Sequence, residues 1–343
     1  MEIFYNILAG GIPVFVFLLL LIGFDNSRII RVNDLFLSLI FGVLAAILSL
    51  LLNNFIQYQF DVSYYELSVG VAPPTEEILK TIFFMHFVYR ARVGFMIDGA
   101  IIGFAIGASF AAIENTIFVY NDPDNTFIVY LVRGVGTAIM HGGVSAFTAL
   151  IAMNFITKFE SIKIIYFLPG LVISITIHLI YNQFFVNPVL SSIIVVFLIP
   201  SMIYIVFFFN ERSLSRWLDM EFDEEVELLQ KLRHGDFSGT RQGKYIMKIK
   251  DQFKPDTVFD MICFLQTYIE LSIKAKSIIM QRQQGLEPKI DDSIINKIKE
   301  LDHLKKSIGR SGRIALAPIL PMRQKDIWKI NLLKAEKNEN NYR

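Results

Sequence analysis

The chain has little of what marks a small soluble or secreted protein. Its 343 residues include a single cysteine, Cys263, which excludes a disulfide framework within one chain and a cysteine-based zinc site. Only 19% of the residues are charged, fewer than a soluble protein of this length carries. The N-terminus lacks a basic segment and a small-residue cleavage site before its first apolar run. We therefore expect that run to be a retained membrane span and not a cleaved signal peptide.

Long apolar runs are what the sequence has instead. Hydrophobic residues make up 53% of the chain, and the mean hydropathy is +0.47. A helix needs about 20 apolar residues to cross the hydrocarbon core. The sequence predicts an all-α polytopic membrane protein of about seven transmembrane helices, at residues 7–24, 35–56, 74–89, 95–118, 127–156, 162–185 and 189–209. Because of Pro73 and Pro74, we expect the third helix to begin at Pro74, after an irregular or re-entrant approach.

The charged residues divide the chain into two parts. Of the 33 Lys and Arg, 8 precede Asn210, as do 12 of the 32 Asp and Glu, so the remainder of the chain is far more charged. This shift predicts a membrane domain at residues 1–212, with a polar core at 73–182, and a cytoplasmic domain at 213–343. Amphipathic stretches at 226–233, 258–280 and 294–308 predict that the second domain is helical, with a frayed end after Ala335.

Basic residues occur in alternate loops only. The first and third loops hold Arg28 and Arg31, and Arg90 and Arg92; Lys158 and Lys163 lie in or beside the fifth loop, whereas the other loops hold no Lys or Arg. Cytoplasmic loops of membrane proteins are enriched in Lys and Arg. The pattern predicts a multi-pass protein of the inner (plasma) membrane, with its N-terminus outside and its C-terminal domain in the cytoplasm.

Four consecutive predicted spans contain ionisable residues. An ionised side chain at the bilayer centre costs about 2.5–3.5 kcal/mol, so its presence there indicates a function. At about 1.5 Å per residue, Glu77, His141 and His178 lie about 17–21 Å from the cytoplasmic boundary, and Glu114 lies about 28 Å from it. We expect these groups to meet in one layer. Small residues at every fourth position, such as Gly99, Gly103 and Gly107, allow the backbones to approach closely.

The ordered polar motifs resemble the PrsW family of glutamic intramembrane proteases, which are distant relatives of the CAAX prenyl endopeptidases. The matching pieces are Glu-Glu-x-x-Lys at 76–80, Asp98-Gly99, Phe-x-x-x-Glu-Asn at 110–115, His141-Gly142-Gly143, and His178-x-x-x-Asn182. The resemblance covers about residues 73–182. It implies hydrolysis of a peptide bond in or beside the membrane, in a substrate such as a single-span anti-sigma factor.

Roles for the candidate site residues follow from their chemistry. We expect Glu76 or Glu77 to polarise a water as general base, with Glu114 sharing the proton. His178, oriented by Asn182, would donate to the developing oxyanion. His141 and Asn115 would complete the polar wall, and Lys80 would neutralise one carboxylate. If Pro74 is the first helical residue, Glu76 and Glu77 lie in the first turn. We expect structural roles for Asp98, Arg133 and His86.

Other functions are compatible with buried acids and histidines. A proton-coupled transporter or channel would use such a chain, although the sequence shows no inverted repeat. A non-catalytic scaffold that binds membrane helices would not need the carboxylates. No His-Glu-x-x-His motif is present, so the sequence favours chemistry without a metal or other cofactor, although zinc stays an alternative. The expected partners are a transmembrane protein substrate, the lipid bilayer and a cytoplasmic partner of the C-terminal domain, but no nucleic acid.

Overall fold

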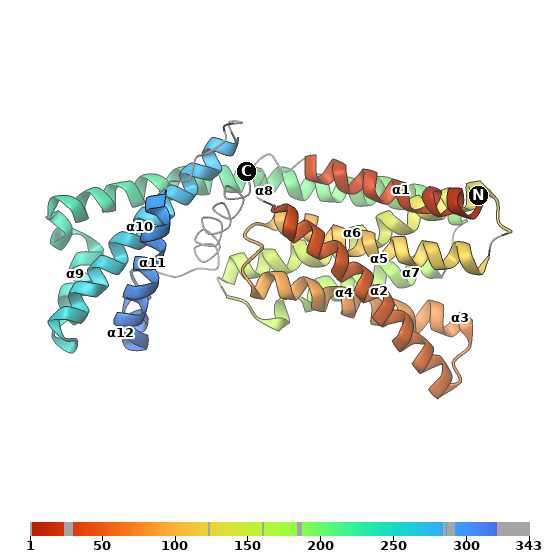
Figure 1. Cartoon of the computed structure of the whole chain (residues 1–343), viewed down its shortest axis with the longest axis horizontal. Helices are drawn as coiled ribbons and strands as arrows, with labels where there is room; N and C mark the ends of the chain where they lie inside the picture. Colours follow the sequence, from red (N-terminus) through yellow and green to blue (C-terminus); the bar gives the residue numbers. More distant parts are fainter. Residues whose placement is uncertain are drawn as a thin grey trace. The chain divides into compact units, whose positions relative to one another are not determined.

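The computed structural model describes residues 2–23, 30–122, 124–159, 161–183, 187–283, 286 and 292–320. Within these ranges every regular element is helical, which together with the apolar helices confirms the predicted all-α polytopic fold (Figure 1). Contacts divide the chain into a first unit, up to Asn210, and a second unit, from Glu211 onward. Phe24, Arg28, Phe185 and the predicted frayed end after Ala335 lie outside the described residues.

The first unit holds the long apolar helices. Four stretches in the described residues are long and apolar enough to cross a membrane, namely Val32–Phe60, Met96–Asn121, Phe127–Phe159 and Ile164–Asn182, and Val189–Ile205 is a shorter apolar helix. The number of spans stays a prediction. The helices of this unit are α1 (Glu2–Gly23), α2 (Val32–Phe60), α3 (Tyr64–Glu66), α4 (Ala72–Tyr89), α5 (Met96–Asn121), α6 (Phe127–Phe159), α7 (Leu168–Asn182) and the start of α8 (Pro188–His234), with a π-helix at Leu67–Val71 and a 3-10 helix at Ile164–Tyr166.

Helices α5 and α6 form the buried centre of the first unit (Figure 1). Their close contact depends on glycine. A Cβ atom added at Gly107 would lie 2.1 Å from the backbone oxygen of His141, and one at Gly103 would lie 2.7 Å from that of Ser145. The expected close approach along this row of small residues is confirmed. It brings the backbone of α5 directly against the turn of α6 that carries His141.

The start of α4 differs from the prediction. Tyr64–Glu66 is α-helical, Leu67–Val71 is a π-helix, and α4 begins at Ala72, so the expected irregular approach and the start at Pro74 are wrong. Pro73 and Pro74 fit in the first turn of α4 because the missing N–H groups of proline are tolerated there. Glu76 and Glu77 therefore lie beyond the first turn, and the expected stabilisation of their charge at the helix N-terminus does not apply.

The second unit has a hydrophobic core of its own. It comprises the end of α8, α9 (Arg241–Ile249), α10 (Pro255–Gln283), α11 (Asp292–Ser307) and α12 (Gly309–Leu316), with 3-10 helices at Asp236–Gly239 and Lys250–Gln252. Helix α10 supplies much of the core, including Phe264 and Leu265. Lys276 of α10 is fully buried and pairs with Glu225 of α8 at 3.1 Å. The helices expected here from amphipathic stretches are all present.

Candidate active site

Helix α4 contributes two carboxylates and one ammonium group. Glu76, Glu77 and Lys80 are all buried. Lys80 follows Glu77 by three residues, a spacing that brings two side chains to the same face of a helix. The Lys80 Nζ atom donates to Glu77 Oε1 at 2.5 Å, and both side chains are 1% exposed. Lys80 thus neutralises one carboxylate of the pair, and that carboxylate belongs to Glu77.

His141 of α6 is oriented from both sides of its ring. Its Nδ1 lies 3.0 Å from Lys80 Nζ, and its Nε2 lies 2.7 Å from Glu114 Oε2. Because an ammonium group can only donate, Nδ1 accepts a hydrogen bond from Lys80 and Nε2 donates one to Glu114. Lys80 Nζ also lies over the ring of Phe110, 4.7 Å from the ring centroid. The two contacts fix both the orientation and the tautomer of His141.

Glu114 of α5 joins the network at its more open end. Arg133 Nη2 donates to its second oxygen, Oε1, at 2.8 Å. The Glu114 side chain is 34% exposed, whereas His141 is 1% exposed. The contact to Arg133 was not expected, although both residues were among the polar groups of the predicted spans. Arg133 also lies over the ring of Phe118, with its guanidinium carbon 4.2 Å from the ring centroid.

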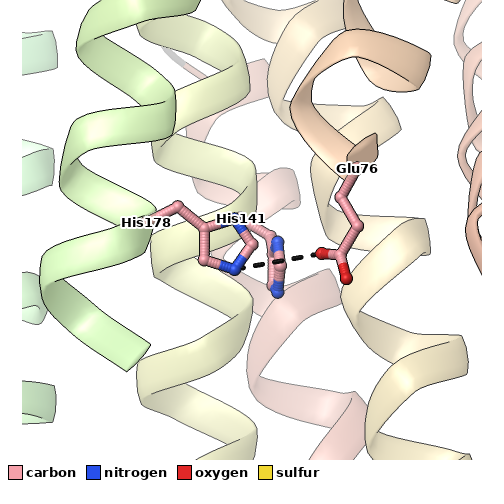
Figure 2. A group of neighbouring side chains, drawn as sticks. All are labelled: Glu76, His141 and His178. Carbon is pink, nitrogen blue, oxygen red and sulfur yellow. Dashed lines mark ion pairs between the residues drawn. The ribbon is translucent and has the colours of Figure 1, made fainter. Parts of the chain in front are cut away.

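His178 of α7 contacts both neighbouring carboxylates. Its Nδ1 lies 2.9 Å from Glu77 Oε1, and its Nε2 lies 3.9 Å from Glu76 Oε2. Figure 2 shows Glu76 and His178 facing one another, with the ring of His141 beside them. The two imidazoles are nearly perpendicular, with centroids 4.6 Å apart. Glu76 Oε2 is buried and has no hydrogen-bond partner among the described residues.

Asn182 has a different contact from the one expected. Its amide Nδ2 donates to the backbone oxygen of Ser68 at 3.0 Å, and it is Glu77 that holds His178. The reason lies in the π-helix. The Ala72 N–H is bonded to the Leu67 oxygen, and the next residue, Pro73, has no N–H to offer Ser68. Asn182 therefore supplies the donor that the proline lacks and ties α7 to the turn before Glu76.

The remaining sequence candidates lie at the edge of this network or outside it. Asn115 is buried on α5, next in the chain to Glu114. Asp98 accepts from the backbone N–H groups of Gly94 and Phe95, so it caps the start of α5. The rings of His86 and Phe41 are nearly perpendicular, with centroids 5.3 Å apart. The structural role expected for Asp98 fits its contacts.

Three of these side chains are also suited to a metal ion. Ligand atoms of Glu76, His141 and His178 all lie within 4.8 Å of one another. Two histidines and one glutamate form a common catalytic zinc site. Glu76 Oε2 has no hydrogen-bond partner in the part of the chain that the structure describes, and a carboxylate at His178 Nδ1 is the usual support of a histidine ligand. His141 is the third candidate ligand, with Lys80 Nζ 3.0 Å from its Nδ1, so the residues suit zinc in kind and number.

The fold and the site together define a helical membrane protein with a buried cluster of carboxylates and imidazoles. Residues 32–209 match the family model described as PrsW family intramembrane metalloprotease. This is more than half of the chain, which therefore belongs to the PrsW family of intramembrane proteases. Comparison with curated proteins and with solved structures gave no match. The second unit lies outside the matched residues.

Proposed function

We propose that this protein hydrolyses a peptide bond of a transmembrane protein substrate, with Glu76 as the general base that activates water. The observation that carries this assignment is the buried oxygen Glu76 Oε2, which has no hydrogen-bond partner among the described residues and faces His178 Nε2 at 3.9 Å. A water molecule bound to both atoms would have its proton acceptor in place. General-base catalysis by a positioned carboxylate typically contributes about 10²–10⁴-fold to the rate.

Glu77 is better suited to positioning than to proton abstraction. Its Oε1 already accepts from Lys80 and from His178. One of these two hydrogen bonds would have to break before Glu77 Oε1 could take a proton from water. In this mechanism Glu77 sets the orientation of His178, and Lys80 compensates its charge.

His178 would act in two protonation states. Because its Nδ1 donates to Glu77, Nε2 of the neutral ring carries a lone pair. Nε2 becomes a donor only when the ring is protonated. His178 would therefore stabilise the oxyanion as the imidazolium and then give its proton to the leaving amine. His141, held by Lys80 and Glu114, would form the rigid wall beside it.

Zinc-dependent hydrolysis is the second candidate, and the cluster of Glu76, His141 and His178 favours it. A zinc ion held there would lower the pKa of bound water to about 7. Glu76 would then serve as a ligand, and Glu114 would be the nearest remaining carboxylate on His141. The two candidates differ in the role of Glu76 and in their response to chelators.

The substrate and the topology are further parts of the proposal. By family resemblance, the substrate is a single-span membrane protein such as an anti-sigma factor. The alternating basic loops support an N-terminus outside the inner membrane and a cytoplasmic second domain. The site would then lie in the outer half of the bilayer. A cytoplasmic partner of the second domain would act from the opposite side.

A reconstituted cleavage assay tests the proposal. Purified full-length protein in lipid nanodiscs is incubated with a panel of fluorescent single-span substrates, and product is quantified by mass spectrometry. We expect Glu76→Gln and His178→Ala to lose at least about 100-fold in rate, because each removes a group that contacts the reacting water. Glu227→Gln is the matched control, since Glu227 is an exposed residue of the second unit that pairs with Lys231.

The outcomes separate the candidates. Wild-type rates in Glu76→Gln would overturn the assignment of the base. Loss of activity with a chelator and its recovery with zinc would establish the metal-dependent reaction instead. Proton flux through liposomes containing protein that cleaves no substrate would favour a transporter, and substrate binding without cleavage would favour a scaffold.

A further inference from the structure

The second unit contains a cavity that the family match does not cover. It has a volume of about 360 Å³, which is within the range of sites for small organic ligands. Its walls come from three helices, the end of α8, α10 and α11. The lining residues are Phe222, Leu229, Arg233, Glu270, Leu271, Ile273, Lys274, Ser277, Ser293, Ile294 and Lys297.

The charges around this cavity are unequal. Among the lining residues that the structure describes, three are basic, Arg233, Lys274 and Lys297, and one is acidic, Glu270. Arg233 Nη2 donates to Glu270 Oε1 at 2.8 Å, and Lys297 pairs with Oε2 of the same carboxylate. Both carboxylate oxygens of Glu270 are therefore engaged by cations. The described lining keeps an excess of two positive charges.

Lys274 is the residue that most clearly points to a ligand. It is partly buried, and no ion pair joins it to any described residue. It follows Glu270 by four positions and precedes Ser277 by three, so the three residues share one face of α10. An ammonium group in a recess with hydroxyl groups nearby is suited to a phosphate or carboxylate.

The other half of the lining is apolar. Phe222 and Leu229 of α8, Ile273 of α10 and Ile294 of α11 contribute hydrocarbon surface beside the basic groups. A free inorganic anion would leave this surface exposed to water. An anion that also carries an apolar or aromatic group would cover it and gain hydrophobic stabilisation.

We propose that this cavity binds a small organic anion, with its phosphate or carboxylate at Lys274 and Lys297 and its apolar group against Phe222 and Ile294. The site lies wholly in the second unit and is independent of the peptidase reaction. It gives that unit a ligand-sensing role. The bound molecule would bridge α8, α10 and α11 and stabilise this unit.

The test uses 2-naphthyl phosphate as a fluorescent probe, with full-length protein in phosphatidylcholine nanodiscs. We expect saturable one-to-one binding by isothermal titration calorimetry, and an increase in the unfolding temperature of the second unit. Inorganic phosphate and neutral 2-naphthol should each bind at least about tenfold more weakly, because each lacks half of the recognised chemistry.

Substitutions assign the binding to this cavity. Lys274→Gln should weaken binding of the probe at least about tenfold. Because Lys274 forms no ion pair with a described residue, this substitution breaks none of the ion pairs around the cavity. Lys299→Gln, on the exposed side of α11, is the matched control and should bind as the wild type does. Absence of saturable binding, equal affinity in Lys274→Gln, or equal affinity for 2-naphthol would overturn the proposal.

Discussion

Replacement of Lys80 by methionine tests how the site is held together. Methionine keeps the apolar length of the side chain but removes the ammonium group. The buried pair with Glu77, at 2.5 Å and 1% exposure on both sides, would be broken, and His141 Nδ1 would lose its donor at 3.0 Å. Removing one partner of a buried ion pair costs about 3–5 kcal/mol. We expect Lys80→Met to lower the free energy of unfolding by about that amount.

A second substitution separates lost charge compensation from lost packing. In Lys80→Met with Glu77→Gln, no uncompensated carboxylate remains, so the double variant should recover much of the stability. Coupling energies between contacting residues reach about 0.5–3 kcal/mol, and this pair should lie at the upper end. The free energy of unfolding is measured by SDS titration in mixed micelles. Lys231→Met, on the exposed surface of α8, is the control and should be unchanged.

The reasoning fails if the two substitutions are additive. Additivity would mean that Lys80 and Glu77 do not interact in the folded protein. Cleavage gives a second readout, because the double variant should stay inactive despite its stability. The Glu77 carboxylate that positions His178 is absent in it.

Three further predictions concern other contacts. Asn182→Leu should lower stability by about 1–3 kcal/mol and reduce cleavage, since the Ser68 oxygen would lose its donor; equal unfolding curves for the variant and the wild type would contradict this. Gly107→Ala should abolish cleavage, because the added Cβ would lie 2.1 Å from the His141 oxygen, whereas Gly23→Ala meets no atom within 4 Å and serves as the control in the same assay. Burial, with Asp260 and Glu300 nearby, raises the pKa of the Cys263 thiol. Mass spectrometry should therefore show that iodoacetamide modifies Cys263 more slowly at pH 8 in the folded protein than after unfolding.

Much of the site could be predicted from the sequence because charge is so costly in apolar helices. Glu77, Glu114, His141 and His178 stood out as ionisable groups that were expected in one layer of neighbouring predicted spans. Lys80 was expected to neutralise one carboxylate of the pair; its four-residue spacing favoured a face shared with Glu76, but in the structure it pairs with Glu77. The row of glycines on α5 indicated the close approach of α5 to α6.

Contacts between distant segments could not be predicted in the same way. The spacing of His178 and Asn182 indicated a shared face of α7, but Asn182 contacts Ser68, 114 residues earlier in the chain. That contact depends on a π-helix, which no local pattern in the sequence indicated. The contact of Arg133 with Glu114 likewise depends on how α5 and α6 pack, so depth alone did not reveal it.

The start of α4 shows where a sound rule led to a wrong boundary. Proline is disfavoured in the interior of a helix, and this rule led us to expect that α4 begins at Pro74. The structure instead passes through π-helical backbone into the first turn of α4, where Pro73 and Pro74 are tolerated. Helix α4 was predicted to span the membrane, but it is not among the described helices that are long and apolar enough to do so, because it contains Glu76, Glu77 and Lys80.

A cryo-electron-microscopy map of the wild-type protein in nanodiscs, at a resolution that shows side chains, tests the central claim most directly. We predict that Glu76 and His178 face one another across a single ordered density for a water molecule or a metal ion, with Glu77 and Lys80 beside them. A map in which Glu76 and His178 point to opposite sides of the helix bundle, or in which Glu76 faces lipid, would contradict the account.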